Sequence, residues 1–333
     1  MSSLNARRPA QTPVCRYAVP LALVLLVPRG SGVAQGLPGW SPINPAAASR
    51  SGLRFEPYSD PAPGRWRATV AVDYGSAIEY NLPSPAPSWL FDAELLRINF
   101  GVVRDLGPRT FAVAELPVLG VYDGFLDGFL EWYHDIFGID MPERDARPKN
   151  AFAYELAPPS GAPVIRDRSA LFLGDLRLGI GYRYNALLQT VGSVTLPTSI
   201  GPDGYGRGTV SLNAVTTLRA PFASRFVYEG SVGLGYTPTN GPLADLQREF
   251  FLAATSGLRL RFWGRQSLFA NLLYHSPYYD DTTLPALDRR ELSLDFGWIL
   301  ATRGGREWRI GMVEDLEPSG PGIDLVFRVG GSF

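Results

Sequence analysis

Residues 322–333, GIDLVFRVGGSF, close the chain with apolar and polar side chains in alternation. The apolar members of one face are Ile323, Leu325, Phe327, Val329 and Phe333, and the polar members of the other are Asp324, Arg328 and Ser332. This period of two predicts a β-strand with one apolar face. An edge strand of a soluble sheet shows the same pattern, so the rest of the chain has to distinguish the two cases.

Twelve strand-like runs with this alternation follow one another, at residues 65–80, 91–104, 110–121, 171–184, 187–198, 209–219, 225–236, 249–263, 266–278, 291–301, 307–316 and 322–333. Most are at least as long as the ~9–11 residues that a tilted strand needs to cross a membrane. Short turns and longer loops alternate between them, a rhythm that a soluble β-sandwich does not explain. The sequence therefore predicts an all-β fold, a transmembrane antiparallel β-barrel of about 12 strands over residues 65–333, with periplasmic termini and extracellular long loops.

The N-terminal residues have the three parts of a secretory signal peptide. Basic residues precede the apolar run 17–27, and small residues lead up to Ala34. We therefore expect residues 1–34 to be removed after export, with the bacterial outer membrane as the destination. Cys15, the single cysteine, leaves with them, so the mature chain has no disulfide and no thiolate metal ligand.

Residues 35–64 are rich in proline, which interrupts both helices and strand ladders. Two interpretations stay open: an irregular periplasmic lead-in to the barrel, or a plug that folds into the lumen. The formal net charge of −1 argues against a nucleic-acid partner, whose usual footprint is a basic patch.

Charged side chains occupy the polar faces of the predicted strands and would point into the lumen. They are Arg67, Asp73, Arg97, Asp175, Arg177, Arg183, Glu229, Arg259, Arg261, Glu291, Asp295, Asp324 and Arg328. The two signs are nearly balanced, whereas a selective pore more often carries a ring of one sign. This balance favours a cross-linked, narrow or partly closed lumen; the alternative is a solvated wall without a functional role.

The longest connection, residues 122–170, contains the one predicted loop helix, at residues 123–138. Its acidic residues recur every four positions, at Asp123, Asp127, Glu131 and Asp135. They fit solvated acids on an amphipathic helix that caps the barrel mouth or lies at the outer interface. The alternative is a divalent-cation site shared with lipopolysaccharide, because carboxylates suit Ca²⁺ or Mg²⁺. We expect no cofactor and no other metal.

The motifs 134–138 (HDIFG) and 174–179 (GDLRLG), together with the signal peptide and the terminal Phe333, resemble a family of uncharacterised proteobacterial outer-membrane barrels. That family is catalogued as a domain of unknown function, so the resemblance implies a localisation and a barrel but no activity. It also implies that Phe333 is the signal read by the barrel-assembly machinery. Outer-membrane lipid and lipopolysaccharide would then be its surroundings.

An outer-membrane lipid hydrolase is the rival class. His275 and Ser276 are the candidate acyl-hydrolase pair, but neighbours on a strand point to opposite faces, so we do not expect an enzyme. A narrow channel or transport protein for small solutes is the favoured function. The remaining alternative is a non-conducting structural or surface-binding barrel that acts through its extracellular loop.

Overall fold

The computed structural model describes residues 39–61, 64–81, 88–138, 144, 147–157, 163–201, 205–241, 243–282, 285–302, 306–317 and 322–333. The predicted signal peptide, residues 1–34, and the first residues of the 35–64 segment lie outside this part. None of the helices in the described ranges has the length and apolar character needed to cross a bilayer.

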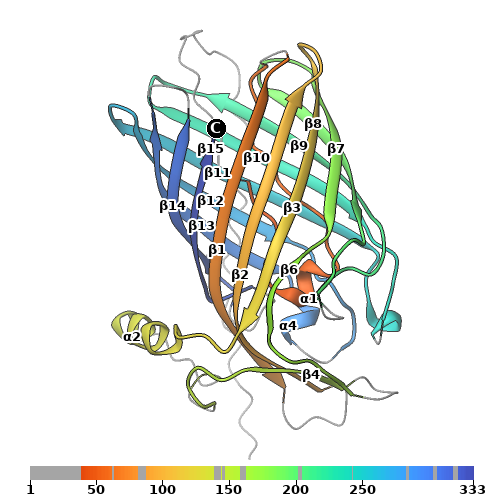
Figure 1. Ribbon diagram of the computed structural model, residues 1–333. Coiled ribbons are helices and arrows are strands. Elements are labelled where there is room, and N and C mark those ends of the chain that lie inside the picture. The colour runs from red at the N-terminus through yellow and green to blue at the C-terminus, as the bar shows by residue number, and fades with distance from the viewer. Residues whose placement is uncertain are drawn as a thin grey trace, which may run out of the picture.

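The strands form one closed antiparallel barrel, shown in Figure 1. In chain order they are β1 (Trp66–Asn81), β2 (Ser88–Asp105), β3 (Thr110–Tyr122), β4 (Ala153–Ala157), β5 (Val164–Ile165), β6 (Ser169–Leu173), β7 (Leu176–Arg183), β8 (Leu188–Leu196), β9 (Ser211–Pro221), β10 (Phe226–Tyr236), β11 (Phe250–Trp263), β12 (Gln266–His275), β13 (Glu291–Ala301), β14 (Glu307–Asp315) and β15 (Leu325–Ser332). The last strand, β15, pairs with β1 and closes the wall.

The wall counts 12 strands because β6 and β7 form one interrupted strand. Both pair with β3, on either side of a break at Gly174 and Asp175. The short hairpin of β4 and β5 is not part of this count, since β4 extends the edge of β2 where β2 projects beyond the wall. The predicted 12-stranded all-β barrel is confirmed, whereas the β4–β5 hairpin in the long connection was not foreseen.

Side chains on the wall are sorted in the opposite way to those of a soluble protein. On β11, Leu252 and Leu258 are exposed on the outer face, whereas Arg259 on the inner face is only 6% exposed. An apolar outer band around a polar interior is the arrangement that lipid imposes on a barrel. The same alternation that predicted the strands therefore sets which residues reach the lumen.

Four helices are described: α1 (Pro45–Ala48), α2 (Asp127–Phe137), the 3₁₀ turn η1 (Ala244–Leu246) and α4 (Pro285–Asp288). The loop helix predicted at residues 123–138 corresponds to α2, which ends at Gly138 in the left-handed conformation, φ 66°. This helix lies outside the barrel wall, while α1 lies within it, near the end from which β4 projects (Figure 1). We call this the long-loop end and the opposite one the short-turn end.

Candidate functional site

Residues 39–61, here called the inner segment, run inside the barrel. The segment is folded back on itself, because Trp40 and Phe55 exchange two backbone hydrogen bonds of 3.2 and 2.8 Å. Between them, α1 turns the chain at the long-loop end. Asn44 caps α1 through its side chain and also donates to Glu79 near the end of β1. A stretch that gave no periodic signal therefore occupies the centre of the barrel.

Two wall arginines hold the first half of the inner segment by its backbone. Arg97 donates to the carbonyl oxygens of Pro42 at 2.6 Å and Ser41 at 3.1 Å. Arg328 donates to the carbonyl oxygen of Gly39 at 2.9 Å. An irregular backbone inside a barrel has no ladder partners, and a buried carbonyl without a hydrogen bond is costly. These guanidinium groups therefore replace the missing partners.

The same two arginines share acidic partners from the wall. Arg97 pairs with Asp73 at 2.9 Å, and Arg328 pairs with Asp73 at 2.8 Å and Asp295 at 2.7 Å. Asp295 is fully buried. The result is a cluster of four charged side chains from β1, β2, β13 and β15 that cross-links the wall and holds the inner segment at once.

The second half of the inner segment carries its own charges. Arg54 pairs with Glu115 on β3 at 2.6 Å, and Glu56 pairs with Arg177 on β7 at 2.8 Å. Farther along, Asp60 forms two hydrogen bonds of 2.7 and 2.9 Å with Arg219 on β9. These pairs connect the inner segment to three strands, so its position is fixed by charges on both partners.

Small wall residues make room for the apolar contact of the inner segment. Gly233 and Gly235 lie on the inner face of β10, where a Cβ atom would come within 2.9 and 3.1 Å of the Leu53 side chain. Leu53 is fully buried there. The glycines of β10 thus form a recess for Leu53, and larger residues would push it out.

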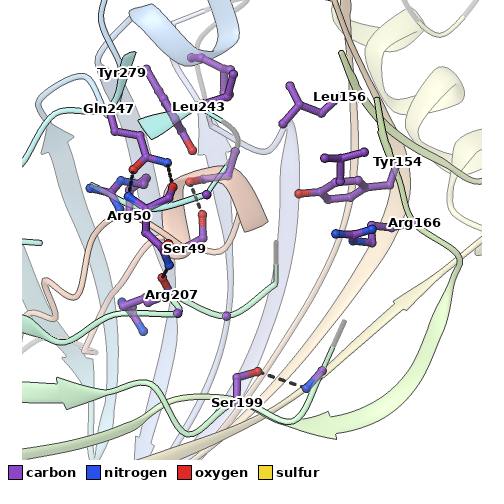
Figure 2. Close-up of a pocket in the computed structure, with 18 of the residues that line it drawn as sticks. Ser49, Arg50, Tyr154, Leu156, Arg166, Ser199, Arg207, Leu243, Gln247 and Tyr279 are labelled. Carbon is purple, nitrogen blue, oxygen red and sulfur yellow. Dashed lines mark hydrogen bonds between the residues drawn. The ribbon is translucent and has the colours of Figure 1, made fainter. Parts of the chain in front are cut away.

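Cavities lie on both sides of the inner segment. The mouth pocket, at the long-loop end, has a volume of about 410 Å³ and is lined by α1, β2, β4 and the loops around Arg207 and Leu243. Figure 2 shows Arg50 and Arg207 on one side of it and Tyr154 and Arg166 on the other. The second cavity, about 480 Å³, lies at the short-turn end between residues 54–61, the start of β1 and the end of β2. The inner segment separates the two.

Most of the predicted lumen charges have partners inside the barrel. Besides those above, Arg67 and Arg183 both pair with Asp105, and Arg259 pairs with Glu307 at 2.7 Å. Three of the acids accept hydrogen bonds from loops or from the inner segment. Asp175 accepts from Arg207, Glu229 accepts from the Tyr58 backbone N–H at 3.2 Å, and Glu291 accepts from the Tyr278 hydroxyl at 2.7 Å.

Two predicted lumen charges lie elsewhere. Arg261 is exposed and donates to the Ser224 carbonyl oxygen at 2.8 Å, since β11 extends past the wall at the short-turn end. Asp324 precedes β15 and pairs with Arg144 at 2.8 Å, and Arg144 also pairs with Asp127 of α2. Asp324 thus connects the long connection, residues 122–170, to the residues that precede β15. In both cases the strand alternation was extended beyond the residues that form the wall.

Three of the four acidic residues predicted on the loop helix are paired with basic side chains. Asp127 pairs with Arg144 at 2.8 Å, Asp123 with Arg168 at 2.5 Å, and Glu131 with Lys149. Asp135 is exposed. Within the described ranges, no group of three or more potential metal ligands comes together. Two acids of α2, Asp127 and Glu131, are thus neutralised by residues that follow the helix.

The two ring nitrogens of His275 contact groups other than the hydroxyl of Ser276. His275 Nδ1 contacts the backbone carbonyl oxygen of Ser276 at 2.6 Å, and Nε2 lies 2.7 Å from the hydroxyl of Ser51 on the inner segment. Sequence reasoning missed Ser51, which gave no signal beyond being a serine. Both side chains are buried and neither lines the mouth pocket or the second cavity. The contact attaches the inner segment to β12.

A closed 12-stranded barrel with an apolar outer band and a charged lumen defines a bacterial outer-membrane β-barrel protein. Within that class, the chain belongs to the family described as "Protein of unknown function (DUF3187)", which matches residues 80–330. The predicted membership of an uncharacterised outer-membrane barrel family is confirmed.

Solved structures with a similar fold include outer-membrane channels. The COG4313 outer membrane channel from Pseudomonas putida F1 matches with 12% identity and a TM-score of 0.54, over 83% of this chain and 97% of that one. The toluene transporter TodX of Pseudomonas putida matches with 13% identity and a TM-score of 0.40, over 89% and 97% of the two chains. At these identities the likeness concerns the fold. No curated protein matches the chain significantly.

Proposed function

We propose that the protein is a narrow outer-membrane channel for small solutes in which the inner segment acts as a plug. The observation that carries the proposal is the position of residues 39–61 between two cavities, one at each end of the lumen. Polar contacts hold much of this segment, and hydrogen bonds and ion pairs can be exchanged for water as the segment moves. A solute would then pass between the two cavities through the space the segment leaves.

The orientation follows the general pattern of outer-membrane barrels, with long loops outside. The mouth pocket is then extracellular and the second cavity periplasmic. The export pathway belongs to the same proposal: residues 1–34 are removed as a signal peptide, residues 35–64 form the plug segment, and Phe333 is recognised by the barrel-assembly machinery. The exposed aromatic face of α2 would contact lipopolysaccharide.

Catalysis is not part of the proposal. Ser51 and His275 have the spacing of a nucleophile and a base, but both are covered by the inner segment and the wall. A substrate would have to displace the plug to reach them. Ester hydrolysis by the purified protein that disappears in a His275→Ala variant would contradict this and point to a lipid hydrolase.

A reversible cross-link tests the plug directly. A Cβ atom on Gly52 would lie 3.0 Å from the Cβ atom of Ser211 on β9, so a shift of roughly 0.5–1 Å gives disulfide geometry. The Gly52→Cys/Ser211→Cys variant is reconstituted into proteoliposomes, and their swelling in solutions of small sugars is measured. We expect oxidation of the two cysteines to stop the swelling and reduction to restore it. The two single-cysteine variants, unchanged by oxidation, are the matched controls.

Deletion of residues 35–64 provides the opposite test. We expect steady conductance in planar bilayers, larger than that of the chain from Gln35 onward, because the barrel loses its central obstruction. If the deleted variant folds and stays silent, the wall side chains close the lumen without the plug. The non-conducting barrel, acting through residues 122–170, would then be the better description.

A further inference from the structure

The mouth pocket combines an apolar wall with a basic wall, and together the two walls restrict the class of ligand that the pocket can bind. We propose that it binds a small amphipathic organic anion, with the acid group on Arg50 and Arg207 and the apolar body on the opposite wall. This inference rests on the proposed channel function and specifies the solute class that its extracellular site takes up.

The apolar wall is built by the extension of β2 and by β4, which pairs with it. Trp89 and Tyr154 meet edge to face with ring centroids 5.4 Å apart, and Leu156 lies beside them. All three side chains are buried. Leu243, from the loop after β10, adds to the same pocket. Such a surface contributes affinity for any apolar body but cannot select for charge.

The basic wall lies across the pocket, where Arg50 and Arg207 approach from one side (Figure 2). Of the described lining residues, three are arginines and one, Asp175, is an acid. Asp175 already accepts from the backbone N–H groups of Ser199 and Arg207 and from the Arg207 side chain, at 2.9, 2.9 and 3.2 Å. The described lining therefore keeps an excess of positive charge.

Arg50 is the strongest element of the argument. Its side chain is 2% exposed, and its terminal nitrogens donate to three backbone carbonyl oxygens, those of Thr237, Pro238 and Arg248, at 3.0 to 3.1 Å. Within the described part of the chain it has no carboxylate at ion-pair distance, and its Nε atom has no hydrogen-bond partner. Glu249 attracts Arg50 only from beyond that distance, and a buried cation without a paired counter-ion is unfavourable. An anion in the pocket supplies the missing charge.

The phenols around the pocket do not supply that charge. Burial raises the pKa of Tyr154 and of Tyr279, so both stay neutral at physiological pH. A plain hydrocarbon would leave Arg50 without a counter-ion, and a small inorganic anion would leave the wall of Trp89 and Leu156 uncovered. A molecule with one acid group and an apolar body satisfies both walls within about 410 Å³.

Isothermal titration of the mature protein in detergent tests the pocket without requiring transport. The probes are 4-phenylbutyrate and its neutral amide, 4-phenylbutyramide, which have the same shape. We expect saturable binding of the acid and about tenfold to a hundredfold weaker binding of the amide, because the amide loses the charge-assisted hydrogen bonds. Equal binding of both probes, or no binding of either, overturns the proposal.

Two variants locate the site. Arg166→Gln changes a half-buried lining arginine outside the barrel wall, on the side of Tyr154, and should weaken binding of the acid alone because it lowers the positive charge of the pocket. Arg50→Gln should do the same, with folding checked by the heat-dependent shift in gel mobility. Arg290→Gln, an exposed arginine paired with Glu317 outside the pocket, is the matched control and should bind normally. If the protein conducts no current but binds the acid more tightly than the amide, the channel function alone is refuted. If it conducts current but binds the acid and the amide equally, the anion site alone is refuted.

Discussion

Removal of Arg328 should destabilise the barrel by leaving a buried acid without a partner. Its Nη1 atom gives Asp295 a hydrogen bond of 2.7 Å, and the other oxygen of Asp295 has no partner in the described part of the chain. In the variant Asp73 still pairs with Arg97, so most of the lost free energy of unfolding comes from the unpaired Asp295. Removing one partner of a buried ion pair costs about 3–5 kcal/mol, and we expect this range for Arg328→Met.

A double-mutant cycle separates the ion pair from the simple loss of side-chain packing. Asp295→Asn removes the acid but keeps its shape, and it leaves Arg328 paired with Asp73 at 2.8 Å. The combined variant, Arg328→Met with Asp295→Asn, no longer buries an unpaired carboxylate. We expect it to be more stable than the sum of the single losses predicts, by about 1–3 kcal/mol.

Urea unfolding in phospholipid vesicles measures these free energies, and the seven tryptophans of the chain provide the fluorescence signal. The comparison is valid where the dependence on urea concentration has the same slope in every variant. Additive losses, within about 0.5 kcal/mol, would show that Arg328 and Asp295 do not interact and would refute this account of the cluster.

Three further predictions concern the plug and the loop helix. Gly235→Val should displace Leu53 and make the inner segment more sensitive to trypsin, at a cost of about 1–3 kcal/mol; Gly192→Val on β8, where a Cβ meets open space, is the control and should digest like the parent chain. A solvatochromic dye on Ile136→Cys, a position 58% exposed on α2, should emit at shorter wavelength in vesicles than the same dye on Asp135→Cys, and equal spectra would place α2 in water. Burial lowers the pKa of His134, while Asp324 raises it and Arg144 lowers it further. The His134 side chain therefore binds a proton more readily when α2 is undocked. Docking of α2 should therefore weaken as the pH falls below about 6.5, shifting the Ile136 dye to longer wavelength, and His134→Gln should remove this pH dependence.

The barrel could be predicted because its determinants are local and repeated. Alternation along each run gives the strands and their two faces, and it also placed side chains such as Arg97 and Arg177 inside. It could not pair them, because the partner of Arg328 depends on which strands become neighbours: Asp73 is 255 positions away and Asp295 is 33 away. Pairing follows from closure of the whole sheet.

The location of the inner segment was left open for a related reason. A proline-rich stretch has no period, so neither of its faces can be assigned to lipid, water or lumen. The available signal was the presence of Arg50, Arg54 and Glu56 in an otherwise apolar and small-residue context. Those charges are as compatible with solvent as with a lumen until the opposing Glu115 and Arg177 are in place.

The position of the inner segment also explains why the lumen charges form no ring of one sign. Arg97 and Arg328 use part of their donors on wall acids and the rest on backbone carbonyl oxygens of residues 39–42. Arg177 and Arg219 are neutralised by Glu56 and Asp60 of the segment itself. The arginine fork suits this role, since it can bind a carboxylate and a carbonyl together. The wall charges are therefore arranged to hold a chain in the lumen, and their pattern is complementary to the charges and carbonyl groups of that chain.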